Sequence, residues 1–387
     1  MSILWERHGV TLYKPEKVCE GYTVIDPFTS RDVWIIDIRG NYVHRWVMPT
    51  IPRHHGMFLE NGHLLYATMA PLPDESDMSF PRVATFAMCG GLLEFDWDGN
   101  LVWKYVDKYQ THTFCRMKNG NTMIPRLVRV PDEMARRVKG GIPGTEDRGM
   151  IWTDDLHEVT PDGKVVWEWS AVDHFDPDVH VLCPLERRGD WTHLNTCEVI
   201  PDGNVLVGFR NIDTFCIIDK ATGKIKWQWI GNGISHQHCP TMLDNGNILV
   251  FDNGAHRKDG SLLNYSRAVE LNPATKKIVW EYKADPPQSF YSALISGCQR
   301  LPNGNTLICE GLKGRVFEVT TDREIVWEYV SPFYAPLHTI GRSYGYSNAL
   351  FRAYRFMPDI PGFKGKELDP RKLDWVNRLY GPEGYGS

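Results

Sequence analysis

The sequence lacks the features that mark membrane proteins, nucleic-acid-binding proteins and disordered chains. No run of about 18 apolar residues occurs, so we expect no segment that spans a bilayer. No basic block occurs either, and 43 basic against 48 acidic side chains give a net charge of −5. That balance excludes binding to nucleic acid through bulk charge. Disorder is excluded as well, because 14 Trp and 12% aromatic residues need a folded core.

Signals for secretion are also missing. The first residues, MSILWERH, have neither the basic region nor the continuous apolar region of a signal peptide. The nine cysteines are odd in number and irregularly spaced, which is typical of reduced thiols and not of a disulfide framework. The sequence therefore favours a cytoplasmic protein.

A repeated hairpin dominates the sequence. It consists of an apolar strand, a turn with acidic residues or Gly, and a strand that carries Trp. The repeated Trp is expected to pack between neighbouring sheets. The six copies read WIIDIRGNYVHRW (34–46), LLEFDWDGNLVWKY (92–105), LHEVTPDGKVVWEW (156–169), FCIIDKATGKIKWQW (215–229), AVELNPATKKIVWEY (268–282) and VFEVTTDREIVWEY (316–329).

A second hairpin, with Asn-Gly or Asp-Gly before an apolar strand, precedes five of these copies. Two hairpins in series form a four-stranded antiparallel sheet, which is the blade of a β-propeller. The five copies read HHGMFLENGHLLYA (54–67), HTFCRMKNGNTMI (112–124), NTCEVIPDGNVLV (195–207), HCPTMLDNGNILV (238–250) and SGCQRLPNGNTLI (296–308).

The first Trp hairpin has no such partner upstream. We therefore expect a C-terminal strand near 348–356 to complete its blade, which predicts an all-β, six-bladed propeller of four-stranded antiparallel blades. Closure of this kind removes exposed sheet edges. We expect a single propeller domain over 1–387, with blade repeats at about 20–356.

Three segments depart from the repeat. Residues 126–151 and 171–192 are rich in Pro, Gly and charge, and we expect them to be loops. Long loops in a compact fold usually cover or build a site. The C-terminal extension 357–387 is polar and is expected to wrap the outside.

Histidines recur at one register of the inner hairpins. In a propeller the first strand of each blade lines the central channel, and positions two apart on a strand share a face. A lone His at such a place would be a polar cap on a strand, but three at one register favour a functional site. Eight residues before the turn glycines lie His54, His112, Asn195, His238 and Ser296, and ten residues before them lie His193 and His236.

Converging imidazoles suit two chemistries. They can act as nucleophiles and as acids or bases near neutral pH. They can also ligate a transition metal, in which case the ligands would be His54, His112, His193 and His238. The residues alone leave both chemistries open.

The chain resembles the bacterial arylsulfotransferase family. The resemblance runs from about 19 to 358 and is strongest at 191–254. It is carried by THLNTCEVIPDGNVLVGFRN, HQHCPTMLDNGNILVFDNG and SGCQRLPNGNTLI. The residues that match the family motifs are His193, Asn195, Arg210, Gln237, His238 and Phe251–Gly254, with His112 at an earlier family His and Ser296 at a small hydroxyl position.

This resemblance implies transfer of a sulfuryl group between phenolic compounds, without a nucleotide donor or a cofactor. It implies that His238 is the nucleophile. It further implies that His112, His193, Asn195 and Arg210 hold the sulfate oxygens. We expect His54, His236 and Ser296 to contact the substrate, which would be a small aromatic molecule.

Two other functions remain open at this stage. One is a metal-dependent lyase, hydrolase or oxidoreductase that acts on a small aromatic substrate with the same histidines and a transition metal ion. The other is a non-enzymatic propeller scaffold, which would need no converging histidines. Fold does not fix function, so the site must decide among them.

Overall fold

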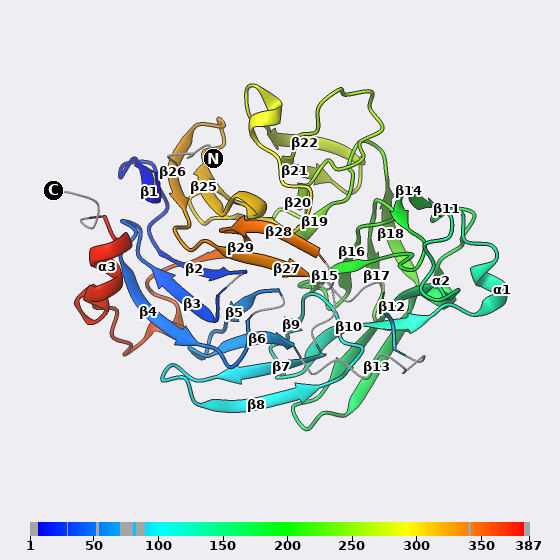
Figure 1. Ribbon diagram of the computed structural model, residues 1–387, viewed down its shortest axis with the longest axis horizontal. Coiled ribbons are helices and arrows are strands. Elements are labelled where there is room, and N and C mark those ends of the chain that lie inside the picture. The colour runs from blue at the N-terminus through cyan, green and yellow to red at the C-terminus, as the bar shows by residue number, and fades with distance from the viewer. Residues whose placement is uncertain are drawn as a thin grey trace. The chain divides into compact units, whose positions relative to one another are not determined.

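A computed structural model describes residues 7–28, 30–51, 54–69, 80–82, 90–339 and 342–382. β-Strands are the main regular secondary structure of these residues (Figure 1). Among these residues, six antiparallel sheets each contain at least four strands. Each sheet is one blade, so the fold is an all-β, six-bladed propeller, as the sequence predicted. The chain divides into two compact units.

The first unit comprises Met1–Tyr66, Leu93–Val102 and Ile295–Ser387. It contains two complete blades and a separate hairpin of β27 and β28 (Ala335–Thr339, Arg342–Ser347). One blade has the order β29-β2-β3-β4 (Leu350–Phe356, Tyr22–Pro27, Asp32–Ile36, Tyr42–Val47). The other has the order β23-β24-β25-β26 (Gly297–Arg300, Thr306–Glu310, Arg315–Val319, Ile325–Val330), with β1 (Gly9–Tyr13) added beside β26.

The C-terminal strand completes the first blade. Strand β29 pairs antiparallel with β2, from Tyr22 opposite Phe356 to Pro27 opposite Leu350. The predicted closing strand at 348–356 is thereby confirmed. Apolar side chains of β2, β3 and β29 are buried in this unit, among them Ile25, Trp34 and Leu350.

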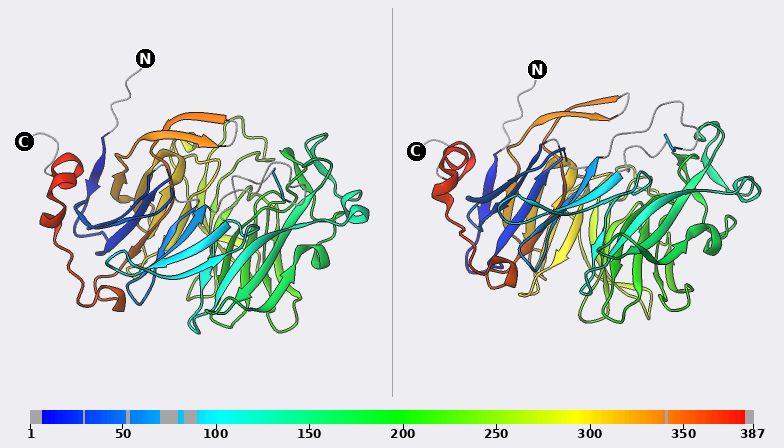
Figure 2. Two further views of the ribbon diagram at one scale, coloured as in Figure 1. Left: turned by 60° about the horizontal axis from the view of Figure 1, so that its bottom comes forward. Right: turned by 90° about the horizontal axis from the view of Figure 1, so that it is seen from below.

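The C-terminal extension lies against the edge strand β4. It forms η3 (Pro361–Phe363), η4 (Pro370–Leu373) and α3 (Asp374–Tyr380). The Asn377 side chain accepts a hydrogen bond from the Tyr42 amide at 2.8 Å and donates one to the Tyr42 carbonyl at 2.9 Å. Both views of Figure 2 show α3 beside β1 and β4.

The second unit comprises Ala67–Leu92 and Trp103–Leu294 and contains three complete blades. Their inner-to-outer orders are β9-β10-β12-β13, β15-β16-β17-β18 and β19-β20-β21-β22. The strand bounds are Cys115–Arg116, Thr122–Arg129, Trp152–Val159, Val165–Ser170, Leu194–Val199, Val205–Phe209, Thr214–Ile218, Ile225–Ile230, His238–Met242, Ile248–Asp252, Arg267–Asn272 and Lys277–Tyr282. The sixth sheet has the order β5-β6-β7-β8 (Gly56–Phe58, Leu64–Met69, Gly90–Phe95, Leu101–Val106).

The repeated Trp ties successive blades of this unit together. Trp167 Nε1 donates to the Lys220 carbonyl at 2.9 Å, and Trp227 Nε1 donates to the Pro273 carbonyl at the same distance. Each acceptor lies in an outer turn of the next blade. The repeated position therefore supplies one large side chain and one hydrogen bond per blade junction.

The two long insertions are not simply loops, and this prediction was wrong in part. Strand β10 continues through Arg129, and short helices form at α1 (Asp132–Ala135) and α2 (Ala171–His174). Strands β11 (Gly140–Ile142) and β14 (Leu182–Arg187) pair in parallel with each other. A pairing between segments about 40 residues apart leaves no local periodicity in the sequence, which is why the pattern did not reveal it.

Candidate functional site

The five predicted catalytic residues all lie in the second unit. His112 precedes β9 and His193 precedes β15. Asn195 lies near the start of β15, Arg210 follows β16, and His238 opens β19. His54 and Ser296 lie in the first unit. There His54 is buried with its ring against Phe351 at 4.7 Å between centroids, and Ser296 Oγ accepts a hydrogen bond from the Gly311 amide at 2.9 Å.

The backbone at these positions is irregular. His112, His193 and His236 have φ values of 41°, 57° and 56°, in the left-handed region that non-glycine residues seldom adopt. Register shifts interrupt β15 between Leu194 and Thr196, and β19 between His238 and Thr241. Strand alternation thus does not extend to His193 and His236, which precede the regular strands. Bulges and strained residues of this kind cluster at functional sites because they re-aim side chains.

A neighbouring amide sets the tautomer of His238. Asn253 Nδ2 donates to the Ser292 carbonyl at 2.8 Å, so its Oδ1 faces His238 Nδ1, also at 2.8 Å. Because an amide oxygen can only accept, Nδ1 of a neutral His238 carries the proton and Nε2 carries the lone pair. The imidazole is buried and is held in the form in which Nε2 can act as a nucleophile.

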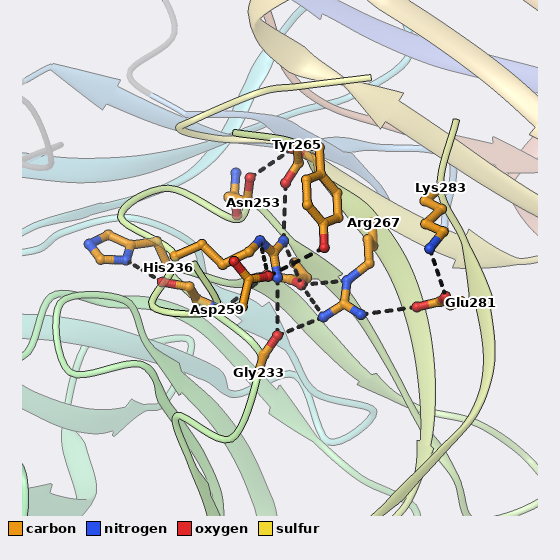
Figure 3. Close-up of polar contacts among 12 residues, drawn as sticks. Gly233, His236, Asn253, Asp259, Tyr265, Arg267, Glu281 and Lys283 are labelled. Atoms are coloured by element: carbon orange, nitrogen blue, oxygen red, sulfur yellow. Dashed lines mark hydrogen bonds and ion pairs between the residues drawn. The ribbon is translucent and has the colours of Figure 1, made fainter. Parts of the chain in front are cut away.

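An arginine–carboxylate network fixes the loop that leads into β19. Asp252, which ends β20, accepts from the Ser235 amide at 3.0 Å and from Arg267 at 2.7 Å. Arg267 also donates to the Gly233 carbonyl at 2.6 Å and to Glu281 at 3.0 Å. Figure 3 shows Arg267 between Gly233 and Glu281, with His236 at the other end of the loop. The network pins the loop within a few residues of His238.

A carboxylate orients His193. Asp190 Oδ2 lies 2.5 Å from His193 Nδ1, and the His193 and His112 rings meet edge to face with centroids 4.4 Å apart. Asp154 lies behind this pair and accepts from the Thr192 hydroxyl at 2.6 Å. Burial and the negative charge of Asp190 raise the pKa of Asp154. An imidazole oriented by a carboxylate is a common general acid or base in enzymes.

Arg210 has an acidic partner, although the surrounding Gly-Phe-Arg-Asn segment (208–211) contains no acidic residue. Its Nη1 donates to Glu186 Oε1 at 2.7 Å and to Asn211 Oδ1 at 2.8 Å. Burial opposes ionisation of Glu186, but His236 and Arg210 together hold its pKa well below the ordinary range. Glu186 lies in β14, inside an insertion that the repeat pattern could not place.

His236 lies between two carboxylates. Its Nδ1 is 3.1 Å from Asp213 Oδ1 and its Nε2 is 3.2 Å from Glu186 Oε1. Burial and the Arg210 charge lower its pKa, but hydrogen bonds to Asp213, Cys183 and Glu186 outweigh them and raise the pKa to about 9. These partners therefore favour the protonated form of the His236 imidazole.

Asn195 joins neighbouring inner strands. Its Nδ2 donates to the Gln237 carbonyl at 2.7 Å, and its Oδ1 accepts from the Thr196 hydroxyl at 3.0 Å. This tie holds β15 beside β19. The predicted contact of Asn195 with a sulfate oxygen stays a prediction.

Sequence reasoning missed the groups that orient the candidate residues. Asn253 stood in a motif that the resemblance had singled out, but its contact with His238 follows only from the pairing of β19 with β20. Asp190 lies three residues before His193, and that spacing alone carries no signal. In the residues that the structure describes, no helix is both long and apolar enough to cross a bilayer.

The fold and these side chains define a β-propeller with imidazoles at the starts of the inner strands β9, β15 and β19 and a buried arginine after β16. The arylsulfotransferase (ASST) family model matches residues 88–332, which is more than half of the chain. The protein therefore belongs to the arylsulfotransferase family. No curated protein matches the chain.

Solved structures share the fold at low sequence identity. A protein of unknown function from Bacteroides caccae is 14% identical with a TM-score of 0.53, and the match covers 87% of this chain and 99% of that one. A virginiamycin B lyase from Staphylococcus aureus is 10% identical with a TM-score of 0.46, over 85% of this chain and 91% of that one. The first of these similarities supports the propeller fold and nothing further.

Proposed function

We propose that this chain is an enzyme that transfers the sulfuryl group of an aryl sulfate to a phenolic acceptor through His238. The observation that carries the proposal is the contact of His238 with Asn253, which leaves Nε2 as the basic nitrogen. Membership of the arylsulfotransferase family supports the same assignment. No nucleotide or cofactor takes part in the proposed reaction.

The proposed reaction has two balanced steps. In the first, His238 Nε2 attacks sulfur, the bond from sulfur to the aryl oxygen breaks, and the phenolate leaves with a proton from His193. In the second, His193 takes the proton of an acceptor phenol, whose oxygen attacks sulfur as the N–S bond breaks. Covalent transfer of this kind splits one difficult step into two.

The anionic oxygens of the ester need donors. His112 and Arg210 are the proposed donors, because guanidinium and imidazole groups form strong, charge-assisted hydrogen bonds with sulfate oxygens. Arg210 forms an ion pair with Glu186 through Nη1, and its other N–H groups are the ones proposed to contact the substrate.

Trapping the covalent intermediate tests the proposal. Native protein incubated with 4-nitrophenyl sulfate and no acceptor should release 4-nitrophenol and gain the mass of one SO₃ group. His238→Asn should lose both signals and keep its melting temperature, whereas the matched variant His63→Asn, at a partly exposed site outside the second unit, should keep both. Absence of an adduct on native protein, or its persistence in His238→Asn, would exclude His238 as the nucleophile.

A further inference from the structure

A cysteine and two histidines meet in the second unit, apart from the proposed nucleophile. Cys183 lies in β14, His236 precedes β19, and His256 follows β20. One ligand atom from each of the three lies within 4.8 Å of the others. Cys183 Sγ is 3.5 Å from His256 Nδ1, and the two imidazole centroids are 4.8 Å apart.

Glu186 supplies a fourth ligand atom to the same place. Its Oε1 lies 3.2 Å from His236 Nε2 and 3.8 Å from His256 Nδ1. Around a tetrahedral zinc ion, bonds of about 2.3 Å to sulfur and about 2.0 Å to nitrogen or oxygen separate sulfur from nitrogen by about 3.6 Å and nitrogen from oxygen by about 3.3 Å. Two of the three observed separations match these edges, and the third, 3.8 Å from His256 Nδ1 to Glu186 Oε1, is about half an ångström longer.

The irregular path of β14 places Cys183 and Glu186 on one side. Residues three apart on a regular strand face opposite ways. Here the pairing with β11 runs from Gly140 opposite Leu182 to Ile142 opposite Arg187, so β14 has three extra residues over this interval. The strand therefore bulges between the two ligands.

The second coordination sphere is also that of a metal site. His236 faces the cluster with Nε2 while its Nδ1 faces Asp213 Oδ1 at 3.1 Å. Metal-binding histidines commonly donate the other ring N–H to a carboxylate, which fixes the tautomer and the ring orientation. The His236 amide donates to the same Asp213 oxygen at 2.8 Å, so the carboxylate holds both the backbone and the ring.

Burial and access suit a bound ion. Cys183 and His236 are buried, whereas the His256 side chain is 32% exposed and offers a path from solvent. Four charged side chains surround the cluster. Glu186 and Asp213 are acidic, and they pair with the basic side chains of Arg210 and Lys258. A cysteine thiolate would add the negative charge that a divalent ion needs.

We propose that Cys183, His236, His256 and Glu186 form a binding site for a divalent transition metal of the zinc type. A thiolate with two imidazoles and a carboxylate is a donor set that zinc prefers over magnesium or calcium. The ion joins β14 to the loops around β19 and β20. This site differs from the set His54, His112, His193 and His238 that the sequence suggested. It adjoins the proposed sulfuryl-transfer site, because His236 is two residues from His238 and Glu186 also accepts a hydrogen bond from Arg210.

Cobalt binding tests the proposal without any activity assay. Full-length protein with its thiols reduced is stripped with a chelator and titrated with Co²⁺, and then with Zn²⁺ in competition. We expect one equivalent to bind, with a thiolate-to-cobalt charge-transfer band that Zn²⁺ abolishes. Cys183→Ser should remove the band and weaken Zn²⁺ binding at least about 100-fold, because it deletes the thiolate ligand.

Two further variants separate loss of metal binding from loss of folding. His256→Ala changes a partly exposed side chain, so the variant should fold. It should nevertheless no longer bind one equivalent of Co²⁺ or Zn²⁺. Cys115→Ser is the control, because Cys115 is another reduced cysteine of the second unit and lies outside the cluster; it should bind like the native protein. Failure of reduced native protein to bind Co²⁺ or Zn²⁺, or an unchanged band in Cys183→Ser, would overturn the proposal.

Discussion

Arg355 and Glu318 form a fully buried ion pair between the closing strand β29 and β25. Both side chains have no exposed surface. Arg355 also donates to the Cys19 carbonyl at 3.1 Å, and its guanidinium lies 4.4 Å from the Trp327 ring centre. Replacing Arg355 by Met keeps an unbranched apolar side chain that can pack in the same place. It leaves the Glu318 carboxylate buried without its cation.

The expected cost follows from these contacts. Removing one partner of a buried ion pair costs about 3–5 kcal/mol. Glu318 keeps two hydrogen bonds, from the Cys19 amide at 2.8 Å and from Asn305 at 2.6 Å. We therefore expect Arg355→Met to lower the free energy of unfolding by about 3 kcal/mol, near the lower end of that range.

Urea unfolding at pH 7, followed by Trp fluorescence, measures this cost. Adding Glu318→Gln to Arg355→Met should recover at least about 1 kcal/mol, because the neutral amide no longer needs a cation. Arg378→Met is the control, since Arg378 pairs with Asp374 on the exposed face of α3 and should cost under about 0.5 kcal/mol. A loss below about 1 kcal/mol in Arg355→Met, or no recovery in the double variant, would refute the reasoning.

The blades could be predicted from the sequence because their information is local. Alternating apolar residues mark each strand, and a glycine marks each inner turn. These turn glycines have φ between 79° and 89°, where a side chain would be strained, so their spacing carries the hairpin register. The positions are Gly62, Gly120, Gly203, Gly246 and Gly304. The closing strand followed from counting hairpins.

The insertions could not be predicted in the same way. The parallel pairing of β11 with β14 joins segments that are far apart in the sequence, and neither has a strand-like alternation. Cys183 and Glu186 share a side only because β14 bulges between them. The Glu186 contact with Arg210 was missed for the same reason.

The candidate site could be predicted from the sequence only in part. The hairpin register found His112, Asn195 and His238, because it repeats with the blades. It did not find the groups that set their chemistry, since Asn253 reaches His238 from the adjacent strand and Asp190 reaches His193 across an irregular turn. Left-handed residues and bulges interrupt strand periodicity at the positions where function needs side chains re-aimed.

Three further predictions concern single residues of the second unit. Burial raises the pKa of Glu198 from 4.5 to about 7, so the folded protein keeps a proton that the unfolded chain releases, and the free energy of unfolding should fall as pH rises between those values. Glu198→Gln should remove this slope and add about 2 kcal/mol of stability at pH 8 in urea melts; an unchanged slope would contradict the assignment. Arg210→Lys keeps the charge but loses the planar fork, so KM for an aryl sulfate should rise at least about tenfold, and unchanged steady-state kinetics would count against anion binding. Asp190→Asn should lower kcat by about 10²–10⁴-fold with little change in KM, because an amide can present N–H to His193 Nδ1 and reverse the tautomer that the carboxylate sets. The control is Asp178→Asn, an exposed carboxylate paired with Lys139 that should leave kcat unchanged. Because Asp190 acts through His193, a merely structural role would show as a lower melting temperature with kcat retained in the folded fraction, and that result would remove Asp190 from the mechanism.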